Sequence, residues 1–181
     1  MSIYERIVTI HGEKTLRKSA LRIRGGAGVF EQVMSGKGFR TALEIGTFRG
    51  CAAAEMSQYC DKVVTLDLVF GKLERHDVAW DRYAFWESLG VHNIEFRAVK
   101  DDMEKQALVR KLKFDFAFID GGHDSFSVKS DFEMVKHCGC VLFHDADDNG
   151  PDVANYVYDF IKTLPEKQVE FIDIFALWRA P

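Results

Sequence analysis

Short apolar runs alternate with longer amphipathic stretches along most of the chain, and this alternation limits the fold more than any other feature. The runs with strand composition are Thr41–Ile45, Val63–Leu66, Ile94–Val99, Phe114–Ile119, Cys140–Phe143, Val169–Phe175 and Ala176–Arg179. Helical spacing of apolar residues fills the intervals, over Cys51–Tyr59, Val78–Leu89, Lys105–Leu112, Ser125–Lys136 and Asp152–Leu164. Alternating strands and helices form βαβ units. The sequence therefore predicts an α/β fold, a doubly wound and mostly parallel seven-stranded sheet with helices on both faces, and one antiparallel strand near Val169–Phe175 or Ala176–Arg179.

The composition is that of a single globular domain. The chain has 181 residues, of which 47% are hydrophobic and 29% charged, and it contains no Pro-rich or Ser-rich linker. We interpret residues 40–181 as the core of the domain. Residues 1–39 would form an N-terminal extension or cap.

The charge and the termini exclude several classes of protein. A net charge of -4 argues against general nucleic-acid binding, which needs a surplus of lysine and arginine. The N-terminus lacks the features of a signal peptide, and no apolar run is long enough to span a bilayer. The four cysteines lack zinc-site spacing, so reduced thiols in a cytoplasmic protein are expected. One basic cluster is either a solvated helix face or a dock for an acidic substrate; it comprises Lys14, Arg17, Lys18, Arg22 and Arg24.

Polar residues collect where the predicted strands end. These ends carry Glu44–Gly46, Asp67, Asp101, Asp120 and His144–Asp145. Open parallel sheets bind ligands beyond the carboxyl ends of their strands, which share one rim. The sequence therefore predicts a ligand site at that rim.

The turn after the first predicted strand has the pattern of a nucleoside site. Gly46 permits a sharp turn there, and Gly50 permits a close approach of backbone or ligand. Asp67 follows Gly46 by about 20 residues, the usual place of an acid that binds ribose hydroxyls. The turn lacks the closely spaced glycines that bring a pyrophosphate to a helix N-terminus. A ligand with ribose and no pyrophosphate is favoured, and S-adenosylmethionine is such a ligand.

Three segments, within about Arg40–Phe160, resemble a known family. Glu44-x-Gly46-x-x-x-Gly50 resembles motif I of the class I S-adenosylmethionine-dependent methyltransferases. Residues 118–124, Phe-Ile-Asp-Gly-Gly-His-Asp, and residues 143–145, Phe-His-Asp, resemble the F-I-D-G-x-H and H-D signatures of a small O-methyltransferase-like subgroup. The resemblance implies a Rossmann-like fold and methyl transfer from S-adenosylmethionine to a small-molecule acceptor, with oxygen as the expected acceptor atom.

The resemblance also implies a role for individual residues. Glu44 and Gly46 would line the methionine end of S-adenosylmethionine, Asp67 would hold its ribose, and Leu68 and Val69 would flank its adenine. Asp101 or Asp102 would face the adenine amino group; the alternative is that these acids cap a helix. The full set of expected cofactor-binding residues is Glu44, Gly46, Thr47, Gly50, Asp67, Leu68, Val69, Asp101, Asp102 and Asp120.

Two histidines and two acids are expected to converge beside the reacting methyl group. An acceptor hydroxyl needs a base or a metal ion to become nucleophilic. Asp120, His123 and His144 are therefore the candidate catalytic residues, with either histidine as the base. The alternative is that these histidines only form structural hydrogen bonds.

A divalent cation is a further expectation. In metal-dependent O-methyltransferases of the catechol type, acids after the fourth and fifth strands bind the metal, and Asp120 and Asp145 match two of these ligands. Ala146 stands where that family has an Asn, so the third ligand would come from Asp147, Asp148 or Asn149. Such an all-oxygen set suits Mg²⁺ or Ca²⁺. The alternative is that these acids cap the following helix.

The sequence also allows a second role for four aromatic residues and two alternative functions for the chain. Four aromatic residues at helical spacing indicate core packing, although one of them could stack on the acceptor: Trp80, Tyr83, Phe85 and Trp86. A nicotinamide-dependent oxidoreductase on a similar fold is the main alternative, and it would need pyrophosphate contacts that the turn does not supply. A non-catalytic S-adenosylmethionine-binding protein is another, and it would have lost the polar cluster, which is intact here. The sequence does not identify the acceptor, and it leaves open whether the chain forms a homodimer.

Overall fold

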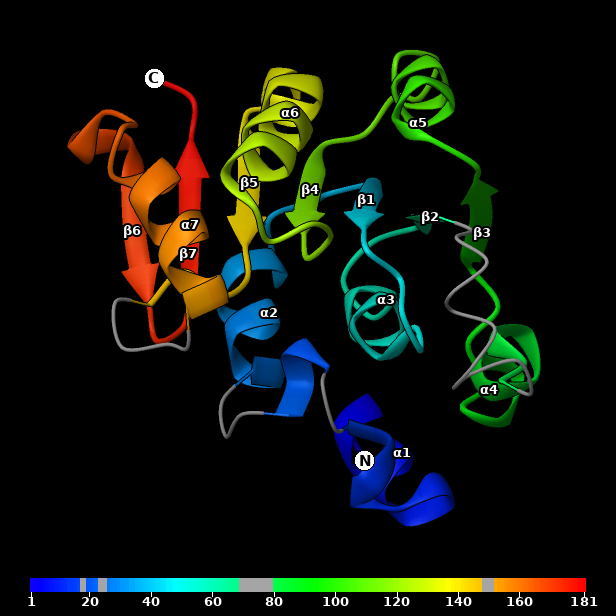
Figure 1. Cartoon of the computed structure of the whole chain (residues 1–181). Coiled ribbons are helices and arrows are strands. Elements are labelled where there is room, and N and C mark those ends of the chain that lie inside the picture. The colour runs from blue at the N-terminus through cyan, green and yellow to red at the C-terminus, as the bar shows by residue number, and fades with distance from the viewer. Residues whose placement is uncertain (17–18, 23–25, 69–79, 148–151) are drawn as a thin grey trace.

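The computed structural model describes the chain except for residues 17–18, 23–25, 69–79 and 148–151. The described residues form one seven-stranded sheet in the order β3-β2-β1-β4-β5-β7-β6 (Figure 1). The strands are β1 Thr41–Ile45, β2 Lys62–Leu68, β3 Ile94–Val99, β4 Phe116–Ile119, β5 Cys140–Phe143, β6 Val169–Ile172 and β7 Phe175–Arg179. The predicted α/β fold is confirmed.

The strand order reverses at the centre of the sheet. β1 pairs in parallel with both β2 and β4, and β4 pairs in parallel with β5. β7 lies between β5 and β6 and is antiparallel to both. The two strands predicted over Val169–Phe175 and Ala176–Arg179 are both present, and the expected antiparallel strand is confirmed. The first strand ends earlier than expected, at Ile172, because the chain turns at Asp173, whose φ is +56°. β6 and β7 therefore form a hairpin.

Helices cover both faces of the sheet (Figure 1). The α-helices are α1 Ile3–His11, α2 Gly26–Met34, α3 Cys51–Met56, α4 Arg82–Ser88, α5 Asp102–Val109, α6 Ser125–Val135 and α7 Asp152–Ile161. Short 3-10 turns span Glu13–Leu16, Ala20–Arg22, Lys136–Cys138 and Glu166–Gln168. None of the helices in the described ranges has the length and hydropathy needed to cross a bilayer.

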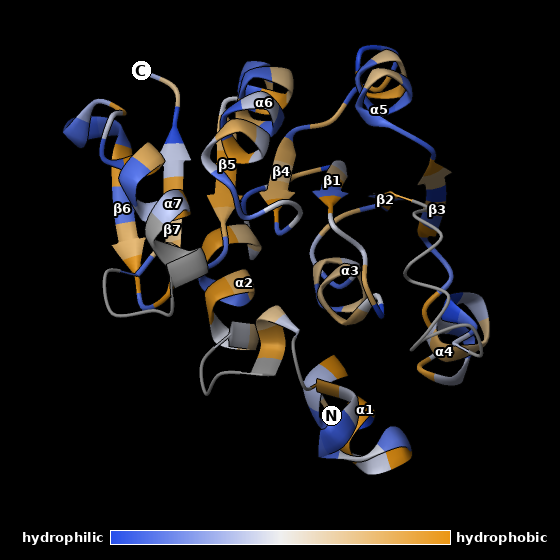
Figure 2. Ribbon diagram, viewed as in Figure 1, coloured by the Kyte–Doolittle hydropathy of each residue, from blue (hydrophilic) through white to orange (hydrophobic). Residues whose placement is uncertain are grey.

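The alternating strand residues divide the core into two layers. Ala42 packs with the helices α1 to α4, whereas Leu43 and Ile45 pack with α5, α6 and α7. Figure 2 shows hydrophobic residues concentrated on the central strands, and helices that carry hydrophobic and hydrophilic residues together. Strands buried on both faces explain why the sequence shows near-continuous apolar runs.

Aspartate caps mark the observed starts of two helices that differ from the expected ones. α5 begins at Asp102 instead of Lys105 because the Asp101 side chain accepts a hydrogen bond from the Glu104 backbone N–H at 2.8 Å. α4 begins at Arg82, where Asp81 caps the Ala84 N–H at 3.1 Å. The expected start of this helix at Val78 lies outside the described residues.

The described part of the first 39 residues packs into the same core as the rest of the chain. Ile7, Leu21 and Phe30 are completely buried in the layer that contains α3. α1 begins with a capping box, in which the side chain of Ser2 and that of Glu5 each accept from the other's backbone N–H. Of the basic cluster, Lys14 lies in a 3-10 turn; the other four side chains lie outside the described residues. All four cysteines are free.

One carboxyl is buried in α3 without full hydrogen bonding. Glu55 is 1% exposed. Its Oε1 accepts from Gln58 Nε2 at 2.7 Å and from the Tyr59 hydroxyl at 3.0 Å. Its Oε2 has no hydrogen-bond partner among the described residues. Burial raises the pKa of Glu55 above its usual value.

We expect the Glu55→Gln variant to gain stability relative to the native protein as the pH rises above the usual carboxyl value of 4.5. The folded state holds the Glu55 proton more tightly than the unfolded state, so deprotonation at higher pH costs the native protein stability. Below 4.5 both states carry the proton and the penalty vanishes. Thermal unfolding of both proteins from about pH 4 to about pH 9 measures the difference. A difference that does not change with pH would contradict this expectation.

Candidate active site at the carboxyl ends of the strands

The turn after β1 touches the end of β4. Gly46 has a φ of +100°, and a Cβ added there would lie 2.0 Å from the carbonyl oxygen of Asp120. Hydrogen bonds hold both residues in place: the Gly46 N–H donates to Leu66 O at 2.9 Å, and the Asp120 N–H donates to Ile45 O at 2.8 Å. Only glycine fits this position, because a side chain would be both strained and blocked. The glycine turn and the acid after β4 are therefore parts of one site.

A buried carboxyl lies beside this turn. Glu44 is 1% exposed and accepts a hydrogen bond from the Thr65 hydroxyl, which in turn lies 2.6 Å from the Thr47 hydroxyl. Burial raises the pKa of Glu44 well above its usual value. Glu44, Gly46, Thr47 and Asp120 line a small pocket, to which the N-terminal segment contributes Ser19 and Ala20.

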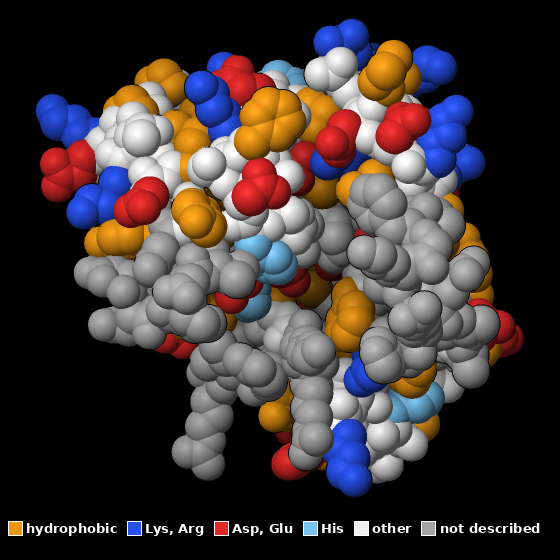
Figure 3. Space-filling view, viewed as in Figure 1, with side chains coloured by type: hydrophobic (Ala, Val, Ile, Leu, Met, Phe, Trp, Pro, Cys, Tyr) orange, Lys and Arg blue, Asp and Glu red, His pale blue; other side chains and the backbone are white. Residues whose placement is uncertain are grey.

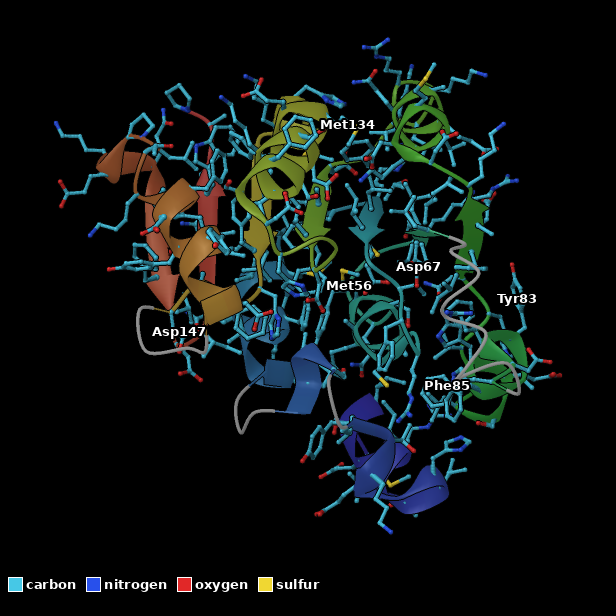
Figure 4. The ribbon with its side chains drawn as sticks, viewed as in Figure 1. Met56, Asp67, Tyr83, Phe85, Met134 and Asp147 are labelled. Carbon is cyan, nitrogen blue, oxygen red and sulfur yellow. The ribbon has the colours of Figure 1, made fainter. Side chains whose placement is uncertain are left out.

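Asp67 is held by the same turn. Its Oδ2 accepts from the Phe48 N–H at 2.9 Å and lies 3.6 Å from the Arg82 Nη2. The Arg82 Nε also donates to the Phe48 carbonyl at 2.6 Å. Burial raises the pKa of Asp67, while Phe48 and Arg82 oppose this shift. Asp67 thus lies at the end of β2, next to the glycine turn (Figure 4).

The aromatic residues around α4 pack and also bind the turn. The Trp80 indole N–H donates to Arg49 O at 3.0 Å, and that of Trp86 donates to Gly50 O at 2.8 Å. Phe85 is buried, and its ring centroid lies 5.0 Å from that of His11 in α1. Tyr83 is 55% exposed and points outward from α4 (Figure 4). Sequence reasoning treated these tryptophans as core and missed their contacts to the turn, although a buried indole N–H needs an acceptor.

The four polar residues expected at the ends of β4 and β5 do come together. His144 Nδ1 lies 3.1 Å from an Asp120 oxygen and 3.2 Å from an Asp145 oxygen. His123 Nε2 lies 2.9 Å from the same Asp145 oxygen. The side chain of His144 is 12% exposed and that of His123 is 40% exposed. Figure 3 shows histidine and acidic side chains gathered in a hollow near the middle of the face in view.

Charge pairing sets the protonation of this cluster. Burial lowers the pKa of His144, but the Asp120 and Asp145 carboxylates outweigh it and raise that pKa to about 10. A hydrogen bond to Asp145 raises the pKa of His123. Burial opposes ionisation of Asp145, yet its two histidine partners hold its pKa well below the usual range. Asp145 also has a φ of +53°, a conformation that non-glycine residues rarely adopt. Backbone strain of this kind concentrates at functional sites.

The same cluster has the donor set of a cation site. The ligand atoms of Asp120, His144 and Asp145 all lie within 4.8 Å of one another. Neither ring nitrogen of His144 has a hydrogen bond of good geometry among the described residues. Among those residues, Asp147 is not part of the convergent group. The other two residues suggested as a third ligand, Asp148 and Asn149, lie outside the described residues.

The residues expected near the adenine are less tightly grouped. The Asp101 side chain caps α5, so the capping alternative describes what it does in this structure. Asp102 is exposed and pairs with Lys105 at 2.9 Å. The Lys105 ammonium also contacts the fully buried Asp131 at 2.6 Å. Leu68 ends β2, half-buried.

Asp131 lies beneath the turn after β4. A Cβ added to Gly121 would lie 3.3 Å from Asp131 Oδ2. Sequence reasoning missed the pair of Lys105 and Asp131, because neither residue belongs to a motif. Val69, the remaining adenine candidate, lies outside the described residues.

Sequence comparison identifies the family. Residues 43–146, more than half of the chain, match a family model described as a methyltransferase domain. The chain belongs to this methyltransferase family. The methyltransferase family expected from the sequence is thereby confirmed, and the observed sheet confirms the expected Rossmann-like fold. No curated protein sequence matches the methyltransferase.

Solved structures with low sequence identity share the fold of this methyltransferase. An O-methyltransferase from Bacillus cereus, solved in complex with SAH, is 17% identical with a TM-score of 0.65, covering 98% of this chain and 90% of that chain. The O-methyltransferase TomG from Streptomyces achromogenes, in complex with SAM, is 16% identical with a TM-score of 0.66, covering 99% and 89%. SAH-bound PaMTH1 from Podospora anserina is 16% identical with a TM-score of 0.65, covering 99% and 87%.

We expect the Gly46→Ala variant to be destabilised by at least about 1–3 kcal/mol, because the added methyl would clash with the Asp120 carbonyl in a left-handed backbone conformation. Gly28→Ala is the matched control: it lies in α2, and a Cβ added there meets no atom within 4 Å. This control should gain about 0.5–1 kcal/mol from reduced chain entropy. Urea unfolding of the two variants and the native protein measures both changes in the free energy of unfolding. Equal stability of Gly46→Ala and the native protein would contradict the close contact.

Proposed function

We propose that the protein transfers the methyl group of S-adenosylmethionine to an oxygen atom of a small-molecule acceptor. The observation that carries this proposal is the contact between Gly46 and the Asp120 backbone, since it joins the glycine turn to the polar cluster after β4. A methyl donor at the turn and an acceptor at the cluster would then be neighbours. The Bacillus cereus and Streptomyces achromogenes relatives, whose structures contain SAH or SAM, support the choice of donor.

The residues around the turn fit the chemical groups of S-adenosylmethionine. The buried Glu44 carboxyl at the pocket suits the positively charged ammonium group of the methionine part. Asp67 stands at the end of β2, where ribose hydroxyls are commonly bound. The turn has no closely spaced glycines for a pyrophosphate, which disfavours a nicotinamide dinucleotide. S-adenosylmethionine supplies an activated methyl group, so the protein has to align the acceptor and remove its proton.

The two histidines of the cluster have different proposed roles. Holding the donor and the acceptor in line can lower the activation barrier by about 7–11 kcal/mol. We assign proton removal to His123, because it is the more exposed histidine of the cluster and Asp145 fixes its ring through a contact of 2.9 Å. This arrangement resembles the pairing of a catalytic histidine with an orienting carboxylate. The more deeply buried His144, between two carboxylates, holds Asp120 and Asp145 together.

The cluster also fits a divalent cation. Asp120, Asp145 and His144 would hold it, since their ligand atoms converge and the His144 nitrogens lack well-formed hydrogen bonds. An imidazole in the set extends the candidates from Mg²⁺ to transition metals such as Mn²⁺ and Zn²⁺. Such an ion would lower the pKa of an acceptor hydroxyl.

We expect the protein to bind adenosylhomocysteine in the micromolar range and NAD more weakly or not at all. Asp67→Ala should weaken adenosylhomocysteine binding by about 1.5–3 kcal/mol through loss of a charge-assisted hydrogen bond to the ribose. Asp61→Ala is a matched control, because this acid is exposed and lies outside the site. Titration calorimetry with both ligands measures these affinities. Binding that Asp67→Ala leaves unchanged would remove Asp67 from the site.

We expect methyl transfer to depend on the polar cluster. If a cation takes part, EDTA abolishes activity, Mg²⁺ or Mn²⁺ restores it, and Asp120→Asn abolishes cation binding measured by calorimetry. If His123 acts alone, EDTA has no effect, while His123→Ala lowers the rate by about 10²–10⁴ without loss of adenosylhomocysteine binding. Release of adenosylhomocysteine across a panel of small hydroxylated acceptors gives the rate. Full activity of the Asp120→Asn, His123→Ala double variant would show that the acceptor is activated elsewhere.

A further inference from the structure

Arg82, the first residue of α4, makes three contacts that meet around Asp67. Its Nε donates to the Phe48 carbonyl at 2.6 Å, and its Nη2 lies 3.6 Å from Asp67 Oδ2. The Phe48 N–H donates to that same Oδ2 at 2.9 Å. The guanidinium also lies over the Phe96 ring of β3, 4.7 Å from its centroid. Arg82 thus links the end of β2, the glycine turn and β3.

The Phe48 and Arg82 contacts to Asp67 both fall on one oxygen of its carboxylate. Both the Phe48 N–H and the guanidinium meet Oδ2, and together they hold the Asp67 carboxylate beside the glycine turn. A carboxylate is a better acceptor for two ribose hydroxyls than a neutral acid. The adjacent guanidinium favours the ionised form of Asp67 against the effect of its burial.

We propose that Arg82 is a positioning residue that orients Asp67 and so sets the selectivity of the site for ribose. This inference rests on the proposed binding of an adenosyl ligand, and it goes beyond it by naming the residue on which ribose discrimination depends. The planar guanidinium fork can contact the Phe48 carbonyl and Asp67 together. An ammonium group cannot reproduce that fork.

The test compares adenosylhomocysteine with its analogue that lacks the ribose 2′-hydroxyl. Arg82→Met should weaken binding of adenosylhomocysteine about tenfold or more, and binding of the deoxy analogue less than about threefold. Arg82→Lys should also weaken binding of adenosylhomocysteine more than binding of the deoxy analogue, since it keeps the charge but loses the planar fork. Arg97→Met is the matched control: Arg97 lies on β3, is half-exposed and pairs with Glu95, and its loss should change neither affinity.

A double-mutant cycle separates positioning from a merely structural role. If Arg82 acts through Asp67, then Arg82→Met should have less than about a twofold effect in the Asp67→Asn background. An effect of Arg82→Met that is equal for both ligands and persists with Asp67→Asn would overturn the inference while leaving the proposed function intact. Failure of the native protein to bind adenosylhomocysteine would instead overturn the proposed function, and the inference with it. If Arg82→Met does not fold, Arg82→Lys provides the same comparisons.

Discussion

The backbone contact between Gly46 and Asp120 is the constraint on which the site depends. β1 and β4 are neighbours at the point where the strand order reverses, and their carboxyl ends meet there without room for a side chain. The contact brings the turn that is expected to bind the donor beside the acid that begins the polar cluster. A substitution at Gly46 would therefore push the glycine turn away from the polar cluster after β4, although it removes no functional group.

A second set of contacts shapes the glycine turn from outside. Three successive carbonyls, of Phe48, Arg49 and Gly50, each accept a hydrogen bond from a side chain of the segment 80–86. Two of the donors are indole N–H groups and the third is a guanidinium. Because these carbonyls are already bonded, the turn can keep one conformation before a ligand arrives. Preorganisation of this kind reduces the entropy lost on binding.

The polar groups at the carboxyl ends of the strands differ in burial, and the buried ones have different contacts from the exposed ones. Glu44 and Asp131 are almost or fully buried and act on their surroundings through fixed contacts, Glu44 with Thr65 and Asp131 with Lys105. His123 has the most exposed side chain of the cluster, which is why we propose it as the base. Removing Lys105 would leave the buried Asp131 carboxylate uncompensated beneath the turn that follows β4.

The sequence by itself determined the fold class, the order of strands and helices, and the four residues of the cluster. It could do so because apolar periodicity and the polar strand ends are local patterns, and parallel strands place their carboxyl ends at one rim. Only the tertiary structure decided that β6 and β7 form a hairpin, that Arg82, Trp80 and Trp86 bind the glycine turn, and that Lys105 pairs with Asp131. These contacts join residues from separate elements, with side-chain directions that no local pattern specifies. They depend on packing between elements that are distant in the sequence, so none of these residues stands out when the sequence is read alone.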